Sequence, residues 1–339
     1  MFEYNWSDEE LLPYQVGALL YSPANNKKIA NDIINEKFTQ PYSVALCLED
    51  AISDFAVQDA ERILVTTFLA LQEARKHKPF YLPKLFVRVR SVTQLVRLGR
   101  KLGQEGSLLT GFIFPKFSVQ NGEEYSREMQ RLNQERRQPL YMMPILESSD
   151  LVDLQKRNGN LEKIKELLDA NRKYVLNVRV GGNDFCNQFG VRRHMDETIY
   201  DIRCVSNVLA DIMTCFGREY VVSGPVWEYF GERSGMWEKG MVREVKQDYL
   251  NGFIGKTVIH PTQIRIVNQQ LAVAKEDYDD AVSIMRLADN PERFVEKNSS
   301  GNRMNEYKTH TAWARKIIIL KKIYGEKEKC EKNIIPLRS

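Results

Sequence analysis

The chain has 339 residues, of which 43% are hydrophobic and 28% charged, so it can bury a large core. Its formal net charge of +4 is slight and spread along the sequence, which argues against nucleic-acid binding and suits a small anionic ligand. The acidic start is unlike a secretory signal, and no apolar run approaches the roughly 18 residues of a membrane span. Five scattered cysteines without a C-x-x-C pair are typical of reduced thiols. We therefore expect a cytoplasmic protein that binds neither nucleic acid nor membranes.

Short apolar runs alternate with helix-like segments eight times along the chain. Several runs, such as VALCL, are apolar throughout, as in parallel strands that are covered on both faces. The predicted strands are 16–21, 43–48, 84–90, 109–114, 140–146, 174–180, 219–222 and 255–259. The predicted helices are 26–37, 54–76, 92–104, 123–137, 149–170, 197–216, 233–250 and 262–274. Strict alternation allows a closed barrel or an open doubly wound sheet, and eight repeats favour a (β/α)₈ TIM barrel.

The sequence after the eighth repeat has a different pattern. A helical stretch is followed by the polar segment EKNSSGN and then by a second helical stretch. We predict two domains, the (β/α)₈ barrel over 1–275 and a C-terminal helical extension over 276–339, which would serve as a lid or an oligomer arm. Neither G-x-G-x-x-G after the first strand nor the P-loop pattern is present, which disfavours the usual nucleotide sites.

Polar residues at the ends of the predicted strands are the first functional candidates, because barrels place their active sites at the carboxyl ends of the strands. These candidates are Glu49, Asp50, Arg88, Arg90, Lys116, Glu147, Asp184 and His260. Carboxylates from separate strands repel one another unless a cation lies among them, and hard oxygen ligands select Mg²⁺. A magnesium site that also chelates a 2-oxo acid is the economical explanation, with Arg88 paired to the substrate carboxylate.

Other residues have both a binding and a structural interpretation. Gly181 and Gly182 would cradle a phosphate with their backbone N–H groups or simply form a tight turn. Arg192 and Arg193 would bind an anionic part of the substrate or form a solvated basic patch.

The strand-end residues have structural alternatives as well. Glu49 and Asp50 suit the first turn of the next helix. Arg88 would also fit an ion pair inside the barrel, Lys116 a position along the rim, and His260 a buried hydrogen bond.

Seven motifs resemble, in order, those of the citrate lyase β-subunit and HpcH/HpaI aldolase superfamily. They are YSPAN at 21–25, LEDAISD at 48–54, FVRVR at 86–90, IFPK at 113–116, PILES at 144–148, VGGNDF at 180–185 and GFIGKTVIHPTQI at 252–264. Each motif is weak alone, but seven in order cover nearly the whole barrel. The chain is thereby identified as a member of this superfamily, in a divergent branch of C–C bond lyases.

The resemblance implies a magnesium-dependent C–C bond lyase or aldolase that acts on a 2-oxo acid or an acyl-CoA-type substrate through a metal-stabilised enolate. It implies that Glu147 and Asp184 ligate Mg²⁺, that Arg88 binds the oxo-acid or enolate end, and that Glu49 and Asp50 orient metal-bound water. The general base is not identified. The family also tends towards homo-oligomers, trimers or hexamers.

The chain departs from the best-known members where a CoA thioester and its phosphates would bind. Arg90 stands where an asparagine is usual, Gln58 where a lysine is usual, and the predicted seventh strand ends without the common aspartate.

Two alternatives stay open. One is a barrel enzyme for a phosphorylated sugar or nucleotide-like substrate, and the other is a non-catalytic ligand-binding barrel. The tail residues Glu306 and His310 lie four apart, on one helix face, and would form a surface pair or reach a neighbouring subunit.

Overall fold

A computed structural model describes residues 5–104, 107–134, 136–231, 235–289 and 294–327. The chain divides into two compact units, 1–268 and 269–339. All eight parallel strands belong to the first unit, whereas the second contains helices and a small antiparallel hairpin. The roles expected for these parts, a catalytic barrel and a lid or oligomer arm, stay predictions.

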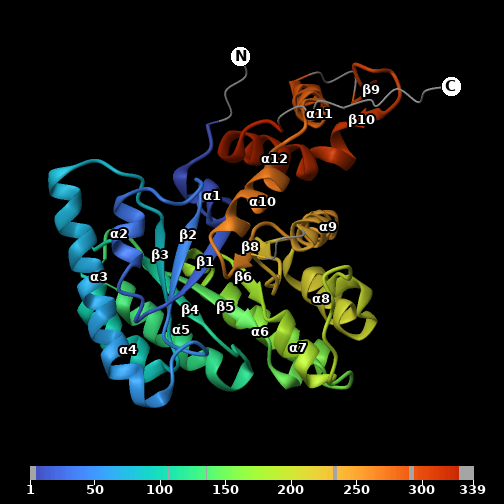
Figure 1. Ribbon diagram of the computed structural model, residues 1–339. Coiled ribbons are helices and arrows are strands. Elements are labelled where there is room, and N and C mark those ends of the chain that lie inside the picture. The colour runs from blue at the N-terminus through green and yellow to red at the C-terminus, as the bar shows by residue number, and fades with distance from the viewer. Residues whose placement is uncertain (1–4, 105–106, 135, 232–234, 290–293, 328–339) are drawn as a thin grey trace. The chain divides into compact units, whose positions relative to one another are not determined.

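Eight parallel strands form the barrel (Figure 1). They are β1 (Ala18–Pro23), β2 (Ser43–Cys47), β3 (Lys84–Arg88), β4 (Leu109–Phe114), β5 (Tyr141–Leu146), β6 (Val178–Val180), β7 (Val222–Ser223) and β8 (Lys256–Val258). Hydrogen-bonded neighbours follow the order β7-β6-β5-β4-β3-β2-β1-β8, and a parallel bridge between Gly224 and Lys256 joins the two ends. The predicted (β/α)₈ barrel is therefore confirmed.

Helices cover the outside of the strands (Figure 1). Those that overlap the eight predicted helical segments are α2 (Ile29–Ile34), α3 (Val57–His77), α4 (Val92–Leu102), α5 (Val119–Asn133), α6 (Arg157–Asp169), α8 (Arg203–Phe216), α9 (Met236–Leu250) and α10 (Thr262–Leu271). Two further helices are α1 (Asp8–Leu11) and α7 (Gly182–Gln188), which follows β6 directly. The sequence does not predict α7, because GNDFCNQ combines weak helix formers with no apolar periodicity.

Local sequence explains where α4 begins and which face it buries. The Ser91 side chain accepts a hydrogen bond from the Gln94 backbone N–H, which satisfies one free donor at the helix start. Leu95, Leu98 and Leu102 then recur at helical spacing and are all buried. The helix therefore packs its apolar stripe against the barrel.

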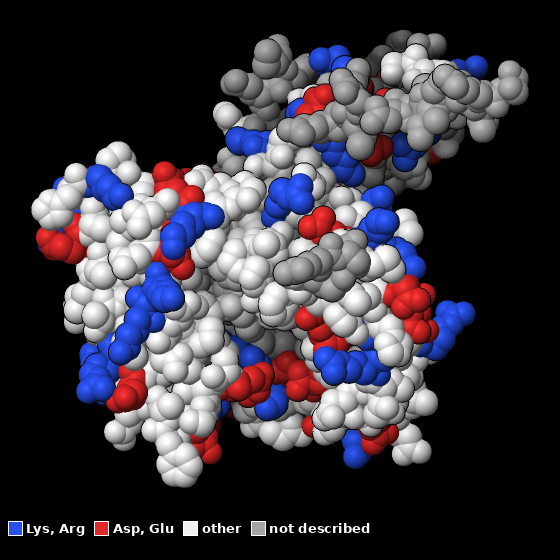
Figure 2. All heavy atoms as spheres, in the orientation of Figure 1, with Lys and Arg blue, Asp and Glu red and all other residues white. Residues whose placement is uncertain are grey.

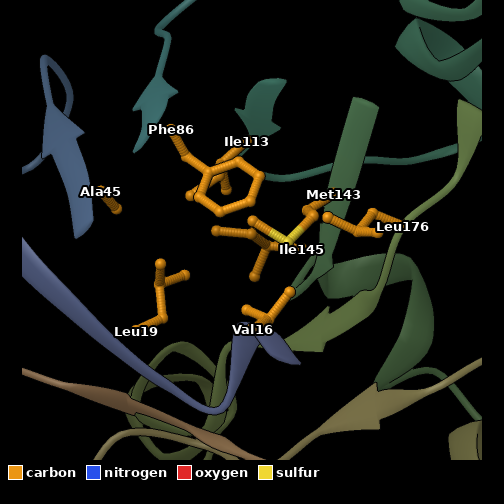
Figure 3. Close-up of a cluster of buried hydrophobic side chains, with 8 residues drawn as sticks. All are labelled: Val16, Leu19, Ala45, Phe86, Ile113, Met143, Ile145 and Leu176. Atoms are coloured by element: carbon orange, nitrogen blue, oxygen red, sulfur yellow. The ribbon is translucent and has the colours of Figure 1, made fainter. Parts of the chain in front are cut away.

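Apolar side chains fill the barrel interior (Figure 3). The cluster consists of Val16, Leu19, Ala45, Phe86, Ile113, Met143, Ile145 and Leu176, each at most 4% exposed. Because these residues come from the five strands β1 to β5 and from the segments before β1 and β6, the cluster joins opposite sides of the barrel. The barrel is a packed core rather than a pore, and the polar site must lie above it.

The second unit pairs two helices with a hairpin. α11 (Lys275–Arg286) packs against α12 (Tyr307–Tyr324), and β9 (Val295–Lys297) pairs antiparallel with β10 (Met304–Glu306). The polar segment expected as a simple break is the hairpin turn, in which the Asn298 side chain accepts the backbone N–H groups of Asn302 and Arg303 at 3.1 and 3.2 Å.

Glu306 and His310 contact each other within this unit. The Nδ1 atom of His310 accepts the backbone N–H of Glu306 at 3.1 Å, at the start of α12. This contact satisfies a free donor at the beginning of the helix. In the part of the chain that the structure describes, no helix is both long enough and apolar enough to cross a membrane.

We predict that Phe86→Ala lowers the free energy of unfolding by about 3–5 kcal/mol, because Phe86 is fully buried in the barrel core and its loss leaves a cavity. Chemical denaturation of the two proteins measures this difference. The matched control is Phe55→Ala, since Phe55 is fully exposed and its removal should change stability by no more than about 0.5 kcal/mol. Equal losses in both variants would contradict the assignment of the core.

Candidate active site

A layer of polar side chains lies directly above the barrel core. Side chains two residues apart on a strand point to the same side of the sheet. Arg88, two residues after the core residue Phe86 on β3, therefore also points into the barrel. The corresponding positions on three other strands or strand ends are Tyr21, Cys47 and Glu147, and all four residues line one cavity of about 370 Å³. Figure 2 shows acidic and basic side chains gathered around a hollow on the face that is drawn.

Arg88 is the centre of this layer. Its side chain is about 6% exposed, and its guanidinium lies 2.7 Å from Glu49, 2.8 Å from Asp50 and 3.5 Å from Glu147. The first two carboxylates follow β2 and the third follows β5. Nε of Arg88 is also buried and has no hydrogen-bond partner in the structure. One guanidinium thus joins three carboxylates that follow two different strands.

Glu147 is a buried carboxyl group whose ionisation is costly. Burial raises the pKa of Glu147 to about 8; Arg88 lowers this pKa only in part, and the negative charge of Asp184 raises it further. The backbone N–H of Lys116 donates to Glu147 Oε1 at 2.8 Å. Lys116 has a positive φ of 49°, so the chain adopts an uncommon conformation where it delivers this donor.

Asp184 lies in the first turn of α7 and also lines the cavity. Its carboxylate forms no hydrogen bond or ion pair with the residues that the structure describes. The structure therefore brings Glu147, Asp184 and Arg88 to the same cavity, as the strand-end argument predicts. Over the described ranges, no group of three or more His, Cys, Asp and Glu side chains is arranged to hold a metal ion.

The two acids after β2 differ in their ionisation. Burial raises the pKa of Glu49, although Arg88 opposes it. Burial also acts on Asp50, but the hydrogen bond with Glu49 and the charge of Arg88 outweigh it and lower the pKa of Asp50. Lys116 Nζ lies 3.1 Å from Glu49 Oε1, and this pair raises the pKa of Lys116. The environment thus separates two adjacent carboxyl groups into a stronger and a weaker acid.

Gly181 and Gly182 are required by close packing. A Cβ atom on Gly181 would lie 2.2 Å from Glu147 Oε2, and one on Gly182 would lie 2.4 Å from Ile199 and 2.7 Å from Pro225. Both glycines line the cavity. Their lack of a side chain is accounted for by these neighbours, without a bound phosphate.

Arg90 points away from the cavity and holds the acidic segment in place. Its Nε donates to the carbonyl of Leu48 at 2.6 Å, and its guanidinium also contacts Asp54 and the carbonyl of Ile52. Arg90 is not part of the cavity lining. Its contacts fix the loop that presents Glu49 to Arg88.

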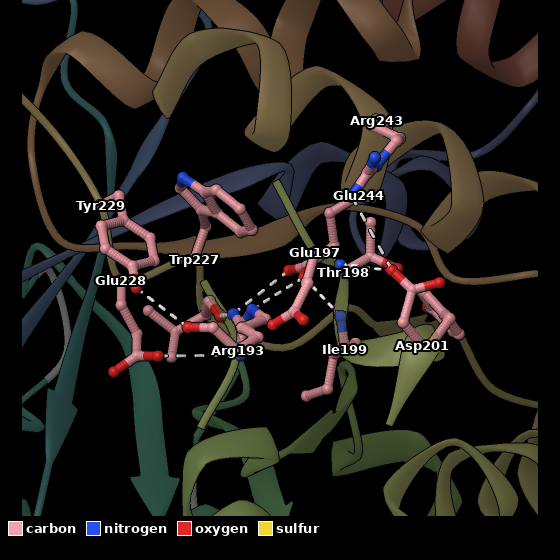
Figure 4. Close-up of polar contacts among 12 residues, drawn as sticks. Arg193, Glu197, Thr198, Ile199, Asp201, Trp227, Glu228, Tyr229, Arg243 and Glu244 are labelled. Atoms are coloured by element: carbon pink, nitrogen blue, oxygen red, sulfur yellow. Dashed lines mark hydrogen bonds and ion pairs between the residues drawn. The ribbon is translucent and has the colours of Figure 1, made fainter. Parts of the chain in front are cut away.

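Arg192 and Arg193 also lie outside the cavity lining. Arg192 is largely exposed and pairs with Glu228 at 3.1 Å. Arg193 is fully buried, with its Nε 3.0 Å from the equally buried Glu244 (Figure 4). Glu244 in turn pairs with Lys256 of β8 at 2.9 Å. A buried arginine that is ion-paired in this way has a structural role, so the contacts give no support to a substrate phosphate at these two residues.

His260 takes part in a local contact at the start of α10. Its ring stacks on Phe230 with centroids 4.7 Å apart, and its Nδ1 lies 2.8 Å from Thr262 Oγ1. It is not part of the cavity lining.

The cavity residues that sequence reasoning missed include Arg179 on β6 and Thr257 on β8. The signal for Arg179 was available, because an arginine within the apolar run NVRV is unusual in a strand that is covered on both faces. Thr257 gave no such signal, since threonine is common in strands.

Solved structures share this fold at low sequence identity. CitE from Mycobacterium tuberculosis, in complex with magnesium, acetoacetate and coenzyme A, has a TM-score of 0.60 and 17% identity, covering 90% of this chain and 98% of its own. A citrate lyase from Burkholderia xenovorans has a TM-score of 0.69 and 14% identity, covering 92% and 93%. The citrate lyase β subunit from M. tuberculosis with oxaloacetate and magnesium has a TM-score of 0.52 and 16% identity, covering 76% and 98%.

These identities support the fold alone. No protein with a curated function matches the sequence. Residues 10–326, nearly the whole chain, match the family described as C–C bond lyase of the TIM-barrel fold. The chain therefore belongs to this family of C–C bond lyases, as its resemblance to citrate lyase β-subunits led us to expect.

Proposed function

We propose that this lyase is magnesium-dependent and that it makes or breaks a C–C bond in a 2-oxo acid or acyl-CoA-type substrate through a metal-stabilised enolate. The observation that carries the proposal is the ion-pair cluster of Arg88 with Glu49, Asp50 and Glu147 at a cavity that Asp184 also lines. An anionic substrate that chelates a cation suits such a mixture of carboxylates and guanidinium.

The charges of Glu147 and Asp184 fit a divalent cation. Arg88 lies within 2.8 Å of two other carboxylates and 3.5 Å from Glu147, and its single positive charge cannot neutralise all four acids. Mg²⁺ often takes only one or two protein carboxylates and keeps waters or substrate oxygens as its other ligands, so it does not need a group of three acids. Glu147 and Asp184 would hold the ion, and when bound it would stabilise negative charge on the substrate oxygens.

The protein's own groups have separate tasks in this proposal. Arg88, whose side chain lines the cavity, binds the oxo-acid or enolate end. Glu49 and Asp50 orient water at the substrate; Asp50 lines the cavity, and Glu49 lies beside it on the same loop. Lys116 holds Glu49 at the rim.

Related structures agree with this substrate class. The CitE and citrate lyase β-subunit structures from M. tuberculosis contain magnesium with acetoacetate and coenzyme A, or with oxaloacetate. These ligands belong to those proteins and support testing oxo acids first. The acyl-CoA option and a homo-oligomeric state, trimer or hexamer, stay predictions for this chain.

We predict that Asp184→Asn abolishes measurable magnesium binding while the fold is kept, because an amide cannot supply the negative charge that the ion requires. Isothermal titration calorimetry with Mg²⁺, together with circular dichroism, measures both properties. The control is Asp169→Asn, at the end of α6 and outside the cavity, which should bind Mg²⁺ as the parent protein does. An unchanged magnesium affinity in Asp184→Asn would count against the assigned ligand.

Magnesium binding should depend on pH through Glu147. Its pKa is raised from 4.5 to about 8, so below pH 8 the folded protein holds a proton that Mg²⁺ must displace. Affinity should therefore fall by up to about tenfold per pH unit as the pH falls below 8. The folded, metal-free protein binds this proton more tightly than the unfolded chain does. Its free energy of unfolding should therefore fall as the pH rises from 4.5 to about 8.

Calorimetry in buffers of different ionisation enthalpy measures the proton that is released. In Glu147→Gln the proton release should disappear together with most of the affinity. A parent protein that binds Mg²⁺ with no proton release near neutral pH would contradict the raised pKa of Glu147.

We predict that Arg88→Lys weakens magnesium-dependent binding of pyruvate or oxaloacetate on the order of 100-fold, because an ammonium group cannot reproduce the planar fork that contacts three carboxylates at once. The free energy of unfolding should fall by only about 1 kcal/mol, less than the binding free energy that is lost, since the positive charge is kept. Arg97→Lys, on the exposed face of α4, is the matched control. Equal oxo-acid affinities in Arg88→Lys and the parent protein would exclude this role.

A further inference from the structure

Arg179 is a buried cation for which the proposed mechanism has no use. It lies on β6 beside Ile145 of β5, which belongs to the barrel core. The residue is only 1% exposed to solvent, yet it lines the same cavity as Arg88 and Glu147. Its side chain is therefore enclosed by protein and forms part of the wall of the substrate cavity.

All the partners of this guanidinium are neutral. One Nη atom donates to Thr257 Oγ1 at 2.8 Å and the other to Asn177 Oδ1 at 3.4 Å, and the Tyr21 hydroxyl accepts a further hydrogen bond. Nε is buried and has no partner in the structure. Across the described part of the chain, no carboxylate forms an ion pair with Arg179.

The contrast with Arg88 shows what is missing. Arg88 is compensated by three carboxylates, whereas the charge of Arg179 is not compensated. An arginine stays protonated in proteins, so it cannot relieve the cost of burial by losing its proton. A buried charge without a counter-ion is unfavourable, and the cavity is where a counter-ion can enter.

We propose that Arg179 binds a second carboxylate of the substrate and thereby selects dicarboxylic over monocarboxylic acids. The inference rests on the proposed function for the 2-oxo group at the Arg88 end, whereas the anion site itself requires neither Mg²⁺ nor catalysis. Arg179 offers a planar fork of donors, which matches a carboxylate in two-point contact.

Tyr21 contacts both arginines that would bind the two ends of the substrate, Arg88 and Arg179. The Arg88 guanidinium lies 5.7 Å from the centre of the Tyr21 ring, and the Tyr21 hydroxyl contacts Arg179. The two guanidiniums are thus placed around one tyrosine side chain, in a cavity of about 370 Å³. A cavity of this size with both arginines in its wall suits a short, linear diacid.

The test compares acids of equal length that differ only at one end, in the absence of Mg²⁺: succinate with butyrate, and glutarate with pentanoate. Calorimetry gives the affinity ratio of diacid to monoacid for the full-length protein. We expect a ratio of at least about ten for one pair. In Arg179→Met that ratio should fall to about one, with the monoacid affinity changed by less than about threefold.

Two further measurements separate this role from a structural one. Removing an uncompensated buried charge should raise the denaturation midpoint of the ligand-free protein, whereas removing a structural arginine should lower it. Thr257→Val, which deletes the hydroxyl that positions Arg179, should reduce the ratio in part, and it supplies the same readout if Arg179→Met does not fold.

The inference is overturned if the parent protein binds diacid and monoacid equally well in both pairs, or binds neither diacid at millimolar concentration. It is also overturned if Arg179→Met keeps the parent's affinity ratio, or loses affinity for diacid and monoacid equally. A separate titration of pyruvate with Mg²⁺ tests the proposed function. If pyruvate fails to bind while the diacid preference depends on Arg179, the anion site stands and the oxo-acid proposal falls.

Discussion

The ion-pair cluster around Arg88 is the constraint on which the rest of the site depends. Taking a guanidinium and three carboxylates out of water is unfavourable unless they lie close together, and here they come from segments that follow different strands. Only a barrel in correct register brings those strand ends to one layer. Two residues outside the cluster support it. Arg90 fixes the loop that carries Glu49, and the backbone N–H of Lys116 fixes the carboxyl group of Glu147.

The cavity has an unequal distribution of charge. At the ends of β2, β3 and β5, and at Asp184 after β6, carboxylates outnumber the cations that contact them, which suits a divalent cation. On the side of β6 and β8, Arg179 is held only by neutral hydroxyl and amide groups. A ligand with a chelating end and a second anionic end therefore has one favourable orientation, so charge alone would align the substrate for the reaction.

Strand-end reasoning predicted much of the fold and part of the site, for physical reasons. Continuous apolar runs located the eight strands, and the carboxyl-end rule grouped Arg88, Glu147 and Asp184 at one mouth of the barrel. The same rule does not say which way a neighbouring side chain points. Arg90 lies two residues after Arg88 but beyond the end of β3, where the strand alternation no longer holds, and Arg193 follows a loop whose path only tertiary packing decides. The rule does not select Arg179, because this residue lies within β6 and not at its end.

The closure between β7 and β8 shows why Arg193 belongs to the framework. β7 has only two residues, and a single bridge from Gly224 to Lys256 completes the barrel, so few backbone hydrogen bonds hold this side. Lys256 compensates by placing its Nζ 2.9 Å from Glu244 and 2.6 Å from Asp248, both on α9 and both buried. Arg193 extends this network from Glu244 to the carbonyl of Val226, a residue that lines the cavity. The ion pairs therefore join β8 to α9 where strand pairing is sparse, and through Val226 they reach the cavity wall.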